Sequence, residues 1–215
     1  MRRALAAGVA ALGLDRPEDL IQGLVGYLGL LQRWNRVYNL TAVRDPGEMV
    51  ALHILDSLSI LPWVHGPRLA DVGTGPGLPG IPLALARPDL RVALVDSNLK
   101  KTRFCTEAVR VLGLAGRVEV VRARVEAWHP PQPFDTVVSR AFARLADFVA
   151  ASAHLLAPGG RLLAMKGRDP GPELAALGPD WTARVEPLTV PGLDARRHLV
   201  IIARSGDAAV PPSPS

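Results

Sequence analysis

The first sixty residues place apolar side chains at steps of three and four, which is the spacing of one face of an α-helix. Over residues 17–36, a proline and two acidic residues precede a periodic run made of Leu20, Leu24, Leu28, Leu31 and Trp34. This pattern predicts an amphipathic helix that packs its apolar face, Trp34 included, against the rest of the protein.

A second helix is predicted over residues 45–61, where Asp45 can cap the amino end and Pro46 suits the first helical position. Polar side chains also share one face of this helix. These are His53, Asp56 and Ser57, at steps of three and four. We expect them to form a hydrogen-bonded anchor for the helix rather than a functional site.

Short runs that are apolar almost throughout replace the helical pattern from residue 68 onward. Strands of this kind, separated by helical stretches, are typical of a parallel sheet covered on both faces. The last two runs form a hairpin-like pair after a Pro-Gly-Gly turn at 158–160. Of the helices predicted between the strands, the first ends at Arg87 and the other two span 98–112 and 145–156. The predicted strands are 68–73, 91–96, 117–123, 135–141, 161–167, 182–190 and 197–204.

The pattern as a whole predicts an α/β fold with a seven-stranded, mostly parallel sheet. We divide the chain into an N-terminal helical extension (1–66), a sheet domain (67–204) and a polar, proline-rich tail (205–215) that we expect to be disordered. With 215 residues, 48% of them hydrophobic, the chain can bury one good core rather than two.

The net charge of +5 is unevenly distributed. Residues 1–66 hold six basic and six acidic side chains, whereas residues 67–215 hold 19 basic and 14 acidic ones. Of the 25 basic residues, 22 are arginine, whose planar guanidinium suits phosphate and guanine recognition. A GC-rich genome would produce the same arginine bias, so composition alone indicates only an anionic partner.

Two features bear on the compartment. The single cysteine, Cys105, excludes an internal disulfide and fits a reducing environment. Residues 1–14 carry two arginines before a weakly apolar run, but this run is largely alanine and glycine and lacks a clear cleavage site. No later stretch is long and apolar enough to span a bilayer. We therefore expect a cytoplasmic protein that does not contact membranes.

The stretch DVGTGPGLPG at residues 71–80 places four glycines between a predicted strand and a helix. Glycines cluster where the backbone has positive φ or where a ligand approaches it closely. Backbone N–H groups and the amino end of the helix can bind that ligand. The next strand ends at Asp96, whose carboxylate can accept hydrogen bonds from both hydroxyls of an adenosine ribose. The loop thus predicts a nucleoside-containing cofactor.

Two cofactors satisfy these features. The spacing of Gly75, Gly77 and Gly80 matches the GxGxxG fingerprint, and Asp96 follows at a suitable distance, so an NAD-dependent dehydrogenase is one alternative. The turn at 158–160 and the final strand pair instead resemble the end of class I S-adenosylmethionine-dependent methyltransferases. Few residues remain for the substrate domain that a dehydrogenase usually carries. A non-catalytic RNA-binding module, the third alternative, would not need so complete a cofactor loop.

Several short motifs together are far more specific than the glycine spacing. They resemble the bacterial 16S ribosomal RNA guanine-N7 methyltransferases of the methyltransferase G type, once called glucose-inhibited division protein B. The similarity runs from about residue 20 to residue 204. It is carried by Asn39-Leu40-Thr41, Arg44-Asp45-Pro46, HILDS at 53–57, DVGTGPGLPGIPLA at 71–84, Leu94-Val95-Asp96-Ser97, Arg124-Val125-Glu126, Ser139-Arg140-Ala141-Phe142, Lys166-Gly167 and Arg197-His198-Leu199-Val200.

The resemblance implies a class I, Rossmann-like methyltransferase fold and methyl transfer from S-adenosylmethionine to N7 of a guanosine in 16S ribosomal RNA. Its implied partner is this RNA or the small ribosomal subunit, and we expect the enzyme to be a monomer. Ala127 departs from the family pattern, which often has a second acid there. The implied cofactor-binding residues are Gly73, Thr74, Gly75, Gly77, Leu78, Asp96, Ser97, Val125, Glu126 and Arg140.

Methylation of guanine N7 makes modest demands on side chains, because N7 carries a lone pair and no proton. It can attack the sulfonium methyl group without a general base, and alignment of the reactants contributes on the order of 7 to 11 kcal/mol. We expect Arg140, directly after a buried strand, to be the catalytic residue that orients the cofactor, guanine O6 or a phosphate. Strand 135–141 lacks the Asn/Asp-Pro-Pro-aromatic motif of enzymes that methylate exocyclic amines. Cys105 lies within a helix rather than beside a proline, which argues against cysteine-dependent methylation of a pyrimidine.

Basic and aromatic residues near predicted strand ends are the candidates for RNA contacts. Each phosphate that a lysine or arginine neutralises raises the affinity for RNA, and this gain falls as the salt concentration rises. An aromatic ring can stack on an unpaired base. No group of residues has the spacing of a metal site. The RNA candidates are Arg44, Lys100, Lys101, Arg103, Phe142, Lys166, Arg196, Arg197 and His198.

Overall fold

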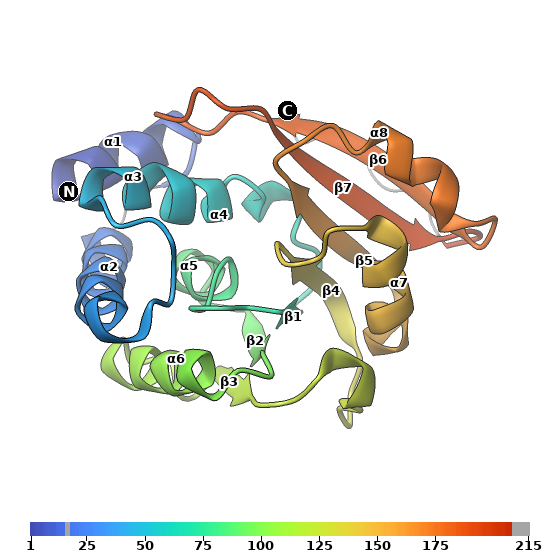
Figure 1. Ribbon diagram of the computed structural model, residues 1–215, viewed down its shortest axis with the longest axis horizontal. Helices are drawn as coiled ribbons and strands as arrows, with labels where there is room; N and C mark the ends of the chain where they lie inside the picture. Colours follow the sequence, from blue (N-terminus) through green and yellow to red (C-terminus); the bar gives the residue numbers. More distant parts are fainter. Residues whose placement is uncertain (16–17, 208–215) are drawn as a thin grey trace.

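The computed structural model describes residues 1–15 and 18–207, in which helices cover both faces of one central sheet (Figure 1). Within these residues the sheet has seven strands in the order β3-β2-β1-β4-β5-β7-β6. β7 is antiparallel to β5 and β6, and the other neighbours are parallel. The predicted seven-stranded, mostly parallel sheet is therefore confirmed. The strands are β1 (Arg68–Val72), β2 (Arg91–Val95), β3 (Val118–Val121), β4 (Phe134–Ser139), β5 (Leu156–Lys166), β6 (Trp181–Leu188) and β7 (Arg197–Arg204).

The helices lie on the two faces in unequal numbers (Figure 1). One face is covered by α1 (Arg2–Ala11), α2 (Glu18–Tyr38), α3 (Pro46–Met49), the π-helical turn η1 (Val50–Leu55), α4 (Asp56–Leu58), α5 (Gly80–Ala86) and α6 (Leu99–Val111). The other is covered by α7 (Leu145–Ser152) and α8 (Gly171–Leu174). Short 3₁₀ turns are η2 (Leu61–Trp63), η3 (Val125–Ala127), η4 (Ala153–Leu155) and η5 (Ala175–Leu177).

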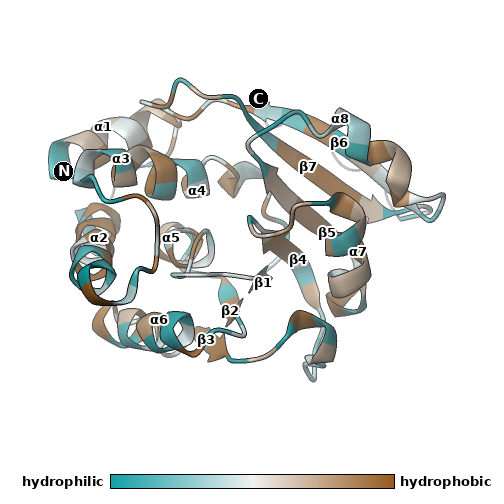
Figure 2. Ribbon diagram, viewed as in Figure 1, coloured by the Kyte–Doolittle hydropathy of each residue, from teal (hydrophilic) through white to brown (hydrophobic). Residues whose placement is uncertain are grey.

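The sheet buries both of its faces, which explains why its strands are apolar at successive positions. Neighbouring residues of a strand point to opposite faces. Leu94 and Leu163 accordingly belong to the core under α2, α5 and α6, whereas Val95 and Leu162 belong to the core under α7. Figure 2 shows the resulting hydrophobic strands between amphipathic helices.

The N-terminal helices share a core with the sheet. Leu5 of α1 and Leu28 of α2 are fully buried in the same cluster as Leu94 of β2. The cap predicted for the second helix is present, because Asp45 Oδ1 accepts a hydrogen bond from Glu48 N (2.9 Å). No helix in the described parts of the chain has both the length and the apolarity to cross a membrane. α1 was not predicted, because its alanines and glycine make the apolar face differ little in hydrophobicity from the rest of the helix.

The structure corrects two predicted boundaries. β5 begins at Leu156 rather than at residue 161, and the predicted helix 145–156 ends as α7 at Ser152. The residues expected to form a turn at 158–160 lie inside β5, where the register with β4 shifts between Phe134 and Thr136. Gly159 has φ of 73°, so a bulge replaces the predicted turn. Pro17 and the tail from residue 208 onward lie outside the described residues.

Candidate functional site

Two adjoining cavities lie at the carboxyl ends of the central strands. The larger, of about 420 Å³, is lined by residues of η1 and of the loop after β1, together with the ends of β4, β5 and β7. The smaller, of about 160 Å³, is lined by residues that follow β2, β3 and β4. Gly73 and Ala141 line both. These two residues therefore stand at the junction of the two cavities.

Most residues predicted to bind the cofactor line these cavities. Gly77 is the exception, and its φ of 88° and the closeness of Ile81 to any added Cβ give it a role in the turn itself. Gly73, Thr74, Gly75, Leu78 and Arg140 line the larger cavity. The smaller is lined by Gly73, Asp96, Ser97, Val125 and Glu126.

The backbone at the junction is uncovered because Gly73 has no side chain. A Cβ added there would lie 2.7 Å from the Cβ of Ala141, closer than two such atoms approach in proteins. The φ angle of Gly73 is 67°, which other residues rarely adopt. A larger residue would therefore strain the backbone and collide with Ala141, which would displace the walls of both cavities.

Two buried carboxylates hold the loop after β1 in place. Asp71 Oδ2 accepts hydrogen bonds from Thr74 Oγ1 (2.6 Å) and from Gly80 N (2.8 Å). Asp96 Oδ2 accepts one from Gly75 N (3.0 Å). The loop is thus tied to the ends of β1 and β2, and charged acceptors make these bonds stronger than neutral ones.

Two helices support the same loop from behind. The hydroxyl of Tyr27 in α2 donates a hydrogen bond to the carbonyl of Pro76 (2.7 Å), and the thiol of Cys105 in α6 donates one to the carbonyl of Gly75 (3.4 Å). Both side chains are fully buried. Burial raises the pKa of the Tyr27 hydroxyl and of the Cys105 thiol, so both remain protonated and able to donate.

Asp96 keeps acceptor capacity toward the smaller cavity. Its Oδ1 accepts a hydrogen bond from Asn98 N (2.8 Å), and Lys101 Nζ lies 3.6 Å from its Oδ2. A carboxylate has about four lone-pair sites. Two backbone donors and one ammonium leave room for a ligand hydroxyl, and Asp96 lines the cavity in which such a hydroxyl would lie.

A buried carboxylate joins two arginines in the larger cavity. Asp56 Oδ2 accepts from Arg140 Nη1 (3.0 Å), and Asp56 Oδ1 accepts from Arg197 Nε (3.2 Å). All three side chains line the cavity. The predicted hydrogen-bonded anchor is present for His53, which contacts Thr41, and for Asp56, and both residues also line the larger cavity. Ser57 donates to the carbonyl of His53 within the same helical segment.

The π-helical turn η1 explains how Arg140 is held. In this wider turn the amide of Asp56 bonds to the carbonyl of Ala51, five residues back. The carbonyl of Leu52 accepts a hydrogen bond from Arg140 Nη1 (3.2 Å). Arg140 thus has two acceptors from one helical segment, and its guanidinium is fixed at the cavity wall.

His53 is a neutral component of this wall. Its Nε2 lies 2.9 Å from Thr41 Oγ1, and the side chain is buried. Burial lowers the pKa of His53 to about 4, and the nearby positive charge of Arg140 acts in the same direction. The imidazole is therefore uncharged at neutral pH.

Two of the predicted RNA residues have other partners. The ammonium of Lys166 lies within 3.3 Å of the carbonyls of Phe142 and Ala143 and of both carboxylate oxygens of Glu173. It has three donors, so none is left for a phosphate. The ring of Phe142 lines the smaller cavity and packs against Phe148, with centroids 5.3 Å apart. These arrangements favour a structural role for Lys166 and a place beside the cofactor cavity for Phe142.

The other RNA candidates are distributed around the cavity openings. Arg197 and His198 line the larger cavity, and Lys101 is half-buried beside Asp96. The others, Arg44, Lys100, Arg103 and Arg196, are exposed. No group of side chains among the described residues could hold a metal ion.

Sequence reasoning missed three residues on which the site depends. Asp71 lies two residues before the first glycine of the cluster, and this position is a signal that could have identified it. Tyr27 and Ala141 offer no such signal, because their role depends on which distant segments the fold brings together. Tyr27 is 49 residues from its partner Pro76.

The chain is similar to known proteins over most of its length. Residues 20–200 match the family model described as rRNA small subunit methyltransferase G. A protein of that name from Alkalilimnicola ehrlichii is 56% identical over 202 residues, covering 92% of this chain and 90% of that protein. Another from Xanthomonas campestris pv. campestris (strain 8004) is 54% identical over 200 residues, covering 93% of each.

Solved structures with lower identity share the fold. An O-methyltransferase from Bacillus cereus, solved in complex with S-adenosylhomocysteine, has a TM-score of 0.59 at 16% identity and covers 95% of this chain and 100% of that one. An rRNA methylase from Streptococcus thermophilus has a TM-score of 0.50 at 16% identity, covering 72% of this chain and 96% of that one.

Replacing Asp71 by asparagine tests the buried carboxylate. Burial raises the pKa of Asp71 from 3.8 to about 6, so the folded protein takes up a proton at higher pH than the unfolded chain. The ionised carboxylate therefore lowers the free energy of unfolding above pH 6, and this loss is relieved as the pH falls from 6 toward 4. Between pH 7.5 and pH 5, urea unfolding should show wild type gaining about 1 kcal/mol relative to Asp71→Asn. Parallel stability curves for the two proteins would contradict this.

Replacing Asp56 by asparagine tests the shared carboxylate. The change removes the charge that pairs with both Arg140 and Arg197 and should lower the free energy of unfolding by about 1 to 3 kcal/mol, less than at a fully buried pair because both arginines are partly exposed. Asp89→Asn, at an exposed ion pair with Arg87, is the matched control and should cost less than about 1 kcal/mol. If urea unfolding shows equal losses of unfolding free energy for the two variants, the Asp56 ion pairs stabilise the protein no more than an exposed pair does.

Proposed function

The chain belongs to the rRNA small subunit methyltransferase G family, and we propose that it transfers a methyl group from S-adenosylmethionine to N7 of a guanosine in 16S ribosomal RNA. Membership of this family decides against a dehydrogenase and against a non-catalytic RNA-binding module. The observation that carries the reaction is the pair of cavities that meet at Gly73, one suited to a nucleoside and one open to a second reactant.

The residues around the smaller cavity fit the adenosine part of the cofactor. Asp96 has free acceptor capacity for ribose hydroxyls, and Val125 and Glu126 line the same cavity. Gly73 presents bare backbone to this cavity, and a Cβ there would collide with Ala141. These features support binding of the adenosine in the smaller cavity.

The larger cavity fits the amino-acid end of the cofactor and the target base. The backbone of Gly73 to Leu78 lies on one wall, and Arg140 faces it as a fixed cation. We assign Arg140 the role of orienting the cofactor carboxylate or the guanine O6. With Arg140 and Arg197 sharing one carboxylate, this group of three carries a net positive charge, which suits an anionic ligand.

The chemistry asks the chain for alignment rather than for proton transfer. The cofactor, when bound, supplies an electrophilic methyl group on a sulfonium. Guanine N7 has no proton to lose, so no side chain has to act as a base. Asp56, the one carboxylate among the described residues that line the larger cavity, is committed to two arginines. This arrangement fits a site whose rigid walls align the two reactants.

We propose that the RNA approaches over the same edge of the sheet. Lys101, Arg197 and His198 lie at the cavities or beside them. Exposed cations nearby, which can neutralise phosphates, are Arg44, Lys100, Arg103 and Arg196. We further propose that the enzyme acts as a monomer in the cytoplasm, on 16S ribosomal RNA or the small subunit.

The proposed reaction is tested by incubating the protein with labelled S-adenosylmethionine and either naked 16S ribosomal RNA or small subunits that lack the modification. Borohydride and aniline cleavage should then map the label to N7 of one guanosine. Asp96→Asn, which keeps the shape of the side chain but removes its charge, should lower cofactor affinity at least about tenfold. Absence of label from both RNA substrates, or label only at another ring position, would overturn the substrate assignment.

A further inference from the structure

A third cavity lies outside the site, between two helices and the edge strand of the sheet. It has a volume of about 470 Å³ and is lined by residues from the end of α2, from α6 and from the end of β3. We call it the α2–α6 groove. The residues that matter here are Trp34, Leu99, Thr106, Val120 and the two cations Arg103 and Arg122, all of which line it.

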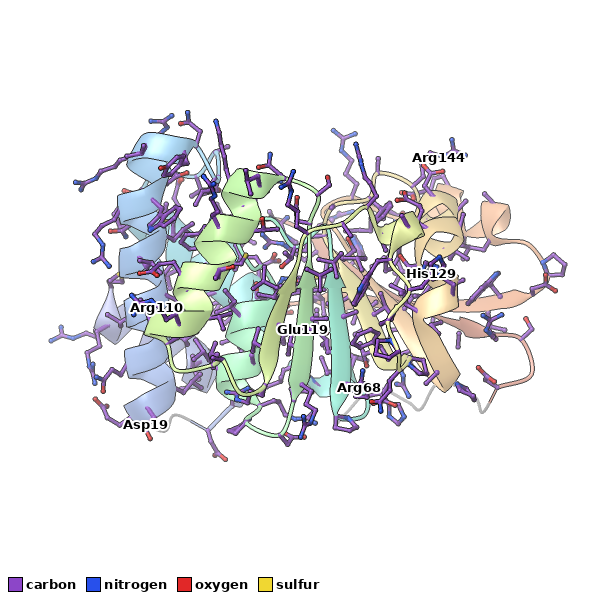
Figure 3. All side chains as sticks on the ribbon, turned by 90° about the horizontal axis from the view of Figure 1, so that it is seen from below. Asp19, Arg68, Arg110, Glu119, His129 and Arg144 are labelled. Carbon is purple, nitrogen blue, oxygen red and sulfur yellow. The ribbon has the colours of Figure 1, made fainter. Side chains whose placement is uncertain are left out.

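The groove opens at the same edge as the cavities. In Figure 3, Asp19 at the start of α2 and Arg68 at the start of β1 both lie at the lower edge of the molecule. The end of α2 therefore lies at the opposite edge, where the carboxyl ends of the parallel strands are. α6 begins at Leu99, three residues after Asp96. An RNA strand whose target base lies in the larger cavity can thus continue past the smaller cavity into the groove.

The groove has an aromatic wall next to exposed apolar side chains. The indole of Trp34 packs edge-on against Phe104, with centroids 5.7 Å apart, and lies 5.2 Å from the ring of Tyr38. Tyr38 is 42% exposed and Leu99 is 39% exposed. Among the described residues only five large hydrophobic side chains are exposed to this degree, and a third member of this set, Val37, lies in the last turn of α2.

The cations of the groove have no acidic partner. Arg103 and Arg122 form no ion pair within the described parts of the chain, whereas Arg110, two turns beyond Arg103, pairs with Glu107 (2.9 Å). Glu107 is the carboxylate that lines the groove, and this pair neutralises it. The groove therefore carries an excess of positive charge beside an aromatic wall.

We propose that the α2–α6 groove binds the single-stranded segment of ribosomal RNA that adjoins the target guanosine. One unpaired base lies against Trp34 and Leu99, and Arg103 and Arg122 neutralise phosphates. Aromatic rings stack on any base, and a positively charged groove follows the backbone, which together bind single strands with little sequence preference. This inference rests on the proposed function, and it gives Trp34 a role beyond the core packing expected for it.

The groove is tested with variants whose side chains lie at its surface. Binding of 16S ribosomal RNA should be measured by fluorescence anisotropy over a range of salt concentrations, and cofactor affinity by calorimetry. Arg103→Gln combined with Arg122→Gln should lower the slope of log affinity against log salt by about 1.4, the value for two phosphate contacts on a single strand. Thr106→Glu, which places a carboxylate in the groove, should weaken RNA binding about tenfold relative to Thr106→Gln, the variant of matched size.

Arg91→Gln is the control for net charge, because Arg91 is exposed and unpaired among the described residues but lies at the amino end of β2. Cofactor affinity should not change in any variant, which shows that each one is folded. If the groove variants match wild type in RNA affinity and salt slope, or if Arg91→Gln has an equal effect, the groove proposal fails. Loss of activity on assembled subunits alone, with unchanged binding to naked RNA, would instead assign the groove to a ribosomal protein. If wild type does not methylate N7 at all, it is the proposed function that fails.

Discussion

The site depends on a loop whose backbone is held open by buried charge. Asp71 and Asp96 accept hydrogen bonds from the loop that follows β1, while Tyr27 and Cys105 donate to two of its carbonyls. The cost of burying Asp71, seen in its raised pKa, is only partly offset by the two hydrogen bonds that it accepts. Because α2, α6, β1 and β2 all contribute, the loop conformation is a product of the whole fold.

The N-terminal helices belong to this arrangement through two separate contacts. Tyr27 supports the loop from α2, and Asp56 joins η1 and α4 to the sheet by pairing with Arg140 and Arg197. The same segment therefore helps to shape both cavities and to fix the cations that line the larger one. This explains why a helical extension packs into one core with the sheet instead of forming a separate unit.

Much of this architecture could be predicted from the sequence, because strands buried on both faces are apolar throughout and the glycine cluster marks a bare backbone. Asp96 could be placed because it ends a predicted strand. The partners of Arg140 could not be foreseen, since Asp56 is 84 residues away and lies next to a π-helical turn that no pattern signals. The structural use of Lys166 depended in the same way on Glu173, in a short helix that was not predicted.

The account is tested most directly by calorimetric titration of S-adenosylhomocysteine into wild type, Gly73→Ala and Gly113→Ala. Both glycines have positive φ, but an added Cβ meets Ala141 at position 73 and open space at position 113. We expect one binding site in wild type and in Gly113→Ala, and at least about 100-fold weaker binding in Gly73→Ala, equivalent to about 2.7 kcal/mol. Equal affinity of all three proteins would show that cofactor binding does not depend on the close approach of Gly73 to Ala141.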